Sequence, residues 1–127
     1  MKTIALFFLT TTLFAESITL DNQTSYPAKQ SKMAVQWANS AREVDDDNKA
    51  LMYGKKLNPK TLQPISQTGK IKLTLPNKAQ HFRVLVWSER SQEPDYTTNW
   101  IDITLDKTYT LENDYLIPVV LMSGSGC

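Results

Sequence analysis

The sequence predicts an all-β fold, and within that class an antiparallel β-sandwich of immunoglobulin-like type with about seven short strands. Short runs in which apolar and polar residues alternate dominate the chain, as is typical of strands with one buried face. Proline, glycine, asparagine and aspartate separate these runs, as expected of turns. The chain has one cysteine, so it lacks the buried cysteine pair of true immunoglobulin domains. A small β-barrel is the alternative architecture.

The first two predicted strands lie in the N-terminal third of the chain. Residues 18–24 place Ile18 and Leu20 on one face. Residues 33–38 alternate between large and small side chains, and their valine and tryptophan favour a pleated surface. Residues 28–44 also carry apolar side chains at helical spacing, so an α+β fold with a helix there is an alternative.

The middle of the chain is predicted to be less regular. Residues 44–48 include three successive aspartates and predict an exposed acidic loop. Residues 49–53 predict a short strand or a single helical turn, ended by Gly54. Two prolines and a glycine within residues 55–69 predict a long irregular connection.

The remaining predicted strands lie in the C-terminal half. Residues 71–75 alternate and predict a half-buried strand, whereas residues 82–87 are apolar on both faces and predict a central, covered strand. Residues 100–105 and 108–111 flank a short turn and predict a hairpin. Residues 115–122 predict the last strand, whose proline indicates an edge or a bulge.

The N-terminus has the organisation of a secretory signal peptide. Lys2 precedes an uncharged apolar run that is too short to span a bilayer, and small residues follow at Ala15 and Ser17. We therefore predict a signal peptide over residues 1–15, with an alternative cut after residue 17, and a single β-sandwich domain over residues 18–122. The mature protein is expected to be exported, to the periplasm or the medium, and to have no transmembrane segment.

The charge balance argues against nucleic acid as a partner. Of the 14 basic residues, Lys2 leaves with the predicted signal peptide, so 13 remain against 13 acidic residues. Proteins that bind nucleic acid present a basic face. A near-neutral domain gives no reason to expect one.

Residues 123–127 predict a flexible tip that ends in the single cysteine, Cys127. One cysteine cannot form an intrachain bridge. In an oxidising compartment, Cys127 is therefore a candidate for an intermolecular disulfide, either to a second copy of the chain in a homodimer or to another protein. A free surface thiol is the alternative.

The sequence offers little catalytic chemistry. His81 is the only histidine, and a zinc site needs three or four histidine or cysteine ligands. The acidic run from Asp45 to Asp47 has clustered oxygens but lacks the glycine of a calcium-binding loop. We therefore predict no metal, no cofactor and no enzymatic activity; a small hydrolase is the least favoured alternative.

The aromatic residues near the polar loop predicted over residues 89–98 give the candidate binding site. Tyr96 lies within this loop, and Asn99 and Trp100 follow at its end. Loops held by a rigid sheet often carry recognition, so Tyr96, Asn99 and Trp100 are the predicted binding residues. The sequence thus predicts a non-enzymatic binding or assembly module that engages a protein partner, as a secreted effector, an envelope accessory protein or an inhibitor. A carbohydrate-binding module that stacks sugars on these aromatics is the alternative.

Overall fold

The computed structural model describes residues 15–123. Residues 1–14 of the predicted signal peptide, and Cys127, lie outside these residues. Strand pairing begins close to the start of the described part, because the Glu16 carbonyl accepts a hydrogen bond of 2.9 Å from the Leu75 N–H. The first strand starts at Ser17, so a cut after residue 17 would remove its first residue.

The described residues form nine β-strands, one α-helix and three 3₁₀ turns. In chain order these are β1 (Ser17–Asn22), β2 (Lys32–Ala38), α1 (Ala41–Met52), η1 (Pro59–Thr61), β3 (Leu62–Ile65), β4 (Gly69–Thr74), β5 (His81–Trp87), β6 (Tyr96–Thr97), β7 (Ile101–Asp102), β8 (Thr108–Leu111), η2 (Asn113–Tyr115), β9 (Ile117–Pro118) and η3 (Val119–Ser123). The fold is mostly β, as predicted, with two sheets and one helix, α1, that the sequence analysis did not predict.

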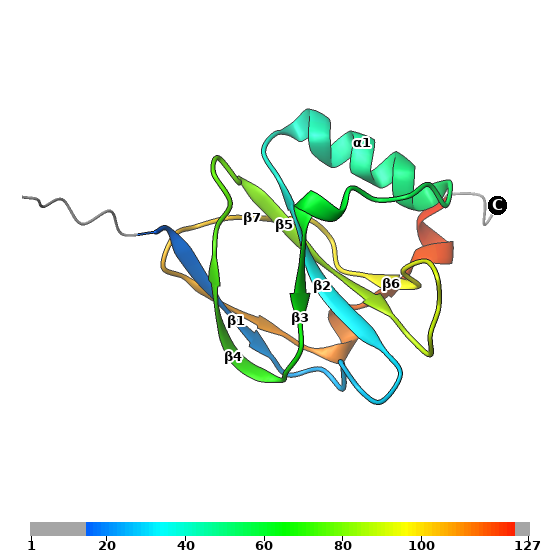
Figure 1. The fold of residues 1–127 in the computed structure, drawn as a ribbon. Helices are drawn as coiled ribbons and strands as arrows, with labels where there is room; N and C mark the ends of the chain where they lie inside the picture. Colours follow the sequence, from blue (N-terminus) through cyan, green and yellow to red (C-terminus); the bar gives the residue numbers. More distant parts are fainter. Residues whose placement is uncertain (1–14, 124–127) are drawn as a thin grey trace, which may run out of the picture.

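The strands form two sheets, which lie on opposite sides of a common core (Figure 1). The smaller sheet has the order β4-β1-β8, and the larger has the order β3-β2-β5-β6-β9, with β7 also paired to β5. β1 and β8 are parallel, and the other pairs are antiparallel. No ladder joins the two sheets within residues 15–123, so the barrel alternative is wrong. The strands that were not predicted are β3, which lies within the expected irregular connection over residues 55–69, and the two-residue β6, which lies in the polar loop around Tyr96.

The core lies between the two sheets. Its apolar side chains come from alternate positions of facing strands, as expected when each strand has one buried face. The fully buried members are Ile18, Leu20, Leu73 and Leu111 of the smaller sheet, with Met33, Val35, Trp37, Ile65, Phe82, Val84 and Val86 of the larger one. Residues 32–38 are thus a strand, and the alternative of a helix over residues 28–44 is wrong.

The helix α1 replaces the predicted acidic loop over residues 44–48. Ser40 caps its start by accepting a hydrogen bond from the Glu43 N–H at 3.2 Å, and the Glu43 carboxylate accepts one from the Asn39 N–H at 2.9 Å. These two bonds resemble a capping box, which stabilises helix starts, except that the Glu43 carboxylate reaches Asn39 and not the capping residue Ser40. The helix lies against the outer face of the larger sheet (Figure 1), where Leu51 is buried.

Two further predictions are wrong in the C-terminal third of the chain. Residues 100–105 and 108–111 do not form a hairpin, because β7 pairs with β5 in the larger sheet and β8 pairs with β1 in the smaller one. The chain between them crosses from one sheet to the other, with Asp106 in a left-handed conformation (φ 62°). Residues 115–122 contain only the two-residue strand β9 between two 3₁₀ turns.

Candidate functional site

β6 and β7 are two halves of one interrupted strand that runs along β5. β6 pairs with β5 as far as Leu85, and β7 pairs with β5 from Phe82. The two residues of β5 between these positions therefore face three residues of the interrupted strand, residues 98–100. The extra residue makes a β-bulge, a feature that redirects side chains. Thr98 replaces the missing ladder bonds: its N–H donates to the Val84 carbonyl, and its hydroxyl accepts from the Val84 N–H, both at 2.9 Å.

Trp100 leaves the bulge toward helix α1. Its indole Nε1 donates a hydrogen bond to the Asn48 side-chain oxygen at 2.9 Å. The Arg83 guanidinium lies over the same ring, 4.5 Å from the ring centroid. A cation over an indole face is a favourable pair when both are shielded from water, so Trp100 holds the bulge against the helix.

Arg83 is the centre of this polar network on the outer face of the larger sheet. It is fully buried, and its guanidinium donates to the side-chain oxygens of Gln36 (2.8 Å) and Asn48 (2.9 Å) and to the Asp47 carbonyl (3.1 Å). Burial lowers the pKa of Arg83 to about 10, so the group is charged at neutral pH. Burial also raises the pKa of the Asp47 carboxyl, an effect that Arg83 opposes.

The buried indole of Trp37 and the half-buried indole of Trp100 make a testable contrast. The Trp37 Nε1 has no hydrogen-bond partner among the described residues, whereas the Trp100 Nε1 has one. We expect Trp37→Phe to change the free energy of unfolding by less than about 1 kcal/mol, because the change removes an unsatisfied buried donor. Trp100→Phe should lower the free energy of unfolding by about 0.5–1.5 kcal/mol, because it removes one of the two hydrogen bonds that the Asn48 oxygen accepts.

Urea denaturation of both variants measures these changes. Each variant removes one indole ring nitrogen and leaves an aromatic ring in place, so each serves as the control for the other. Equal losses in the two variants would contradict the expectation.

The structure does not bring the three predicted binding residues to one patch. Tyr96 contacts the core, and its ring centroid lies 6.3 Å from that of Tyr26. Trp100 packs on the outer face of the larger sheet, and Asn99 is exposed. Ligand binding by Tyr96, Asn99 or Trp100 stays a prediction, and so does the carbohydrate hypothesis, although the Trp100 indole N–H is already bonded to Asn48.

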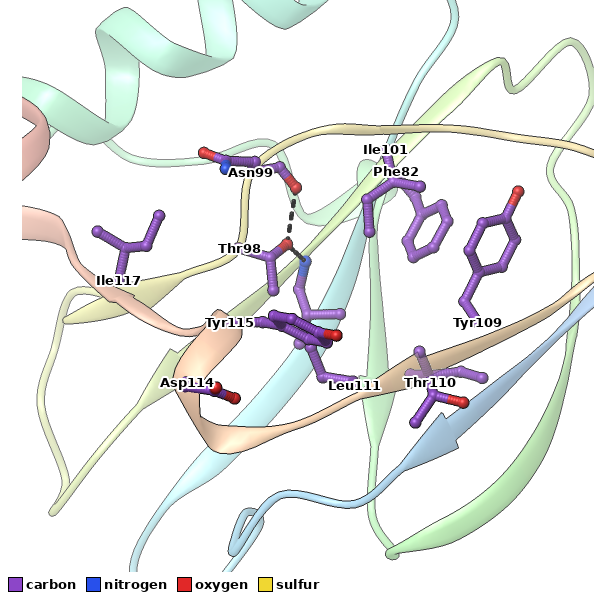
Figure 2. Close-up of a pocket in the computed structure, with 12 residues that line it drawn as sticks. Phe82, Thr98, Asn99, Ile101, Tyr109, Thr110, Leu111, Asp114, Tyr115 and Ile117 are labelled. Carbon is purple, nitrogen blue, oxygen red and sulfur yellow. Dashed lines mark hydrogen bonds between the residues drawn. The ribbon is translucent and has the colours of Figure 1, made fainter.

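A cleft of about 430 Å³ opens between the two sheets, beside the bulge (Figure 2). This volume lies within the range of small-ligand and peptide-anchor pockets. Its lining comes from β1, β5, the bulge with β7, β8, η2 and β9. The lining residues are Leu20, Phe82, Val84, Thr98, Asn99, Ile101, Tyr109, Thr110, Leu111, Asp114, Tyr115 and Ile117.

The apolar lining of the cleft belongs to the core itself. Leu20, Phe82, Val84 and Leu111 are each at most 3% exposed, although all four line the cleft. Tyr115, by contrast, is 52% exposed. An apolar group that entered the cleft would therefore contact the core directly.

One side of the cleft is a free strand edge. The Thr19 and Gln23 N–H groups, in and just after β1, donate to the carbonyls of Lys107 and Leu111. The backbone groups of the odd-numbered residues in and beside β8 therefore face β1. The backbone groups of Thr108 and Thr110 must point the opposite way, since successive peptide groups of a strand alternate in direction. None of the described strands pairs on that side of β8. Free edges of this kind are templates for pairing with another chain.

The other side of the cleft is partly closed by Tyr109. Its hydroxyl donates to the Asp102 carbonyl at 3.0 Å and accepts from the Thr104 N–H at 2.7 Å. The Tyr109 ring meets Phe82 edge to face, with centroids 5.1 Å apart. Tyr109 therefore satisfies one backbone group at the end of β7 and one just beyond it, while the β8 edge stays open.

Polar side chains line the outer part of the cleft. Asn99, Thr110, Asp114 and Tyr115 are all exposed. Their side chains make no hydrogen bond to any other residue between 15 and 123, so they are available to a ligand. Asp114 is the one charged residue among the described residues that line the cleft.

Other candidate chemistry lies away from the cleft. His81 Nδ1 lies 2.8 Å from the Asp102 carboxylate, on the outer face of the larger sheet. Within the described part of the chain, no three histidine, cysteine, aspartate or glutamate residues cluster as a metal site would require.

None of the helices in this part is long and apolar enough to cross a membrane. The intermolecular disulfide of Cys127 stays a prediction.

Sequence reasoning did not identify the cleft, the free edge at Thr108 and Thr110, or Asp114. The alternation in β8 does show which side chains face the core. Nothing local in the sequence shows that one side of this strand has no neighbour. No protein-family model, curated protein or solved structure is significantly similar to this chain. The functional proposal therefore rests on the geometry of the cleft.

Proposed function

We propose that this chain is an exported, non-enzymatic binding module that engages a protein partner by strand addition. In this proposal an extended segment of the partner pairs with the free edge of β8 and inserts one apolar side chain into the cleft. The observation that carries the proposal is the position of an apolar cleft of about 430 Å³ directly beside that edge.

The free edge of β8 and the apolar cleft would contribute to different parts of the binding free energy. In strand addition, main-chain hydrogen bonds provide affinity and pockets for alternate side chains provide specificity. Burial of one large apolar side chain contributes about 1.5–3 kcal/mol, and the cleft offers Phe82, Val84 and Leu111 as contacts. The backbone groups of Thr108 and Thr110 offer the hydrogen bonds.

Two further parts of the proposal have separate support. Export is supported by the charged, apolar and small residues at the N-terminus in the order that a signal peptide requires. An immunoglobulin-like form of the fold is supported by two mainly antiparallel sheets that share one core.

Proline at the β8 edge should block the proposed pairing. We expect Thr110→Pro to weaken binding of a partner peptide about tenfold or more, because it removes an outward N–H and places a ring where the partner strand would lie. The same residue makes no ladder bond to β1, so the sheet stays paired. Peptides selected from a randomised display library on the wild-type protein provide the probes, and isothermal titration calorimetry measures their affinity.

Lys72→Pro is the matched control. Lys72 lies on β4, at the opposite edge of the same sheet, and the Leu75 N–H bond to Glu16 shows that the Lys72 N–H also points outward. Circular dichroism checks that both variants fold. Failure to select any peptide whose affinity falls in Thr110→Pro and not in Lys72→Pro would overturn the proposed function.

A further inference from the structure

The charges around the cleft are unevenly placed. Glu112 and Asp114 follow the C-terminal end of β8, and both are exposed. Lys107 precedes the other end of β8, where its ammonium lies 4.9 Å from the Tyr109 ring centroid. The C-terminal end of the free edge is therefore acidic.

Asp114 is placed to act on whatever enters the cleft. Asp114 lines the cleft, and Figure 2 shows the Asp114 carboxylate beside the turn that carries Tyr115. No other described residue donates a hydrogen bond to this carboxylate, so it has not been neutralised by a neighbour. Complementary charges at the rim of an interface select partners and orient them more than they add affinity.

We propose that the partner segment carries a lysine or arginine next to the apolar residue that enters the cleft, and that Asp114 selects this basic residue. The inference rests on the proposed function, because it names the chemistry of the segment that adds to β8. The apolar residue provides contact with the core residues of the cleft, and the basic residue pairs with the acidic end of the edge.

The composition of the selected peptides is the first test. Peptides selected on the wild-type protein should be enriched in lysine or arginine beside a large apolar residue, with acidic residues depleted at that place. Selection on Asp114→Lys should reverse this preference and enrich glutamate or aspartate there, because the rim then carries the opposite charge.

Affinity measurements on single variants are the second test. Asp114→Asn should weaken a selected basic peptide roughly two- to five-fold, the effect expected of an exposed ion pair. The loss should disappear when the basic residue of the peptide is replaced by glutamine, and it should shrink in 1 M salt, where screening is nearly complete. Asp46→Asn, an exposed acidic residue on α1, is the matched control and should leave affinity unchanged.

The outcomes separate this inference from the proposed function. Peptides that lose affinity in Thr110→Pro but show no basic preference, or bind Asp114→Asn and Asp46→Asn equally, would overturn the role of Asp114 while strand addition stands. Peptides that bind equally well to Thr110→Pro and Lys72→Pro, or the absence of any selected peptide, would overturn both.

Discussion

Replacement of Arg83 by alanine is expected to lower the free energy of unfolding by about 3–5 kcal/mol, because it removes a large buried side chain together with the hydrogen bonds that it donates. Arg83 is fully buried and bonds to Gln36, Asn48 and the Asp47 carbonyl. Alanine leaves the Gln36 oxygen without this donor, whereas the Asn48 oxygen still accepts from Trp100, and it opens a cavity under α1. It also removes the cation that opposes the raised pKa of Asp47. Guanidinium denaturation followed by tryptophan fluorescence measures the loss.

Arg42→Ala is the control for this experiment. Arg42 lies on α1 and is exposed, so its replacement should change the free energy of unfolding by no more than about 0.5 kcal/mol. If Arg83→Ala cost less than about 1 kcal/mol, the polar network would not be what holds α1 on the sheet.

Replacement of Asn22 by alanine is expected to lower the free energy of unfolding by about 2–3 kcal/mol. Asn22 is 1% exposed. Its amide nitrogen donates to the carbonyls of Tyr26 (2.8 Å) and Gln67 (3.1 Å), and its oxygen accepts from the Thr24 N–H (3.1 Å) and hydroxyl (2.7 Å). One side chain thus ties the end of β1 to two turns, and its loss leaves buried polar groups unsatisfied.

Thermal and urea unfolding of Asn22→Ala should be compared with those of Asn77→Ala. Asn77 is exposed in the turn after β4, so its replacement should cost little. Equal stability of the two variants would show that water replaces the bonds of Asn22.

The regular strands could be predicted because their alternation reflects the core directly. β2 and β5 place large apolar side chains on the inner face at every second residue, and this pattern is local. Helix α1 could not be recognised in the same way. Its inward stripe includes Asn48, which bonds to Arg83 and Trp100, so the apolar periodicity that identifies helices is interrupted by a polar contact. The Ser40 and Glu43 pair was the available sequence indication.

The cleft was beyond sequence reasoning for a different reason. Its lining comes from strands and turns far apart in the chain, and its opening depends on β7 and β8 lying in different sheets. The turn between these two strands predicted a hairpin. A hairpin would have paired β7 with β8 and left no cleft between them. Asn99 was predicted as a binding residue and lines the cleft, whereas Tyr96 and Trp100 are held by contacts with Tyr26 and Asn48.

The parallel pairing of β1 with β8 also affects how the chain reaches its folded state. β1 is the first strand and the middle one of the smaller sheet, yet β8 ends only at Leu111. That sheet therefore cannot be completed until most of the chain has been synthesised. Folds that depend on such distant pairings form slowly, on millisecond to second timescales, because loop closure precedes the stabilising contacts. Slow folding is compatible with the proposed export, because a transport machinery would then meet a chain that is still extended.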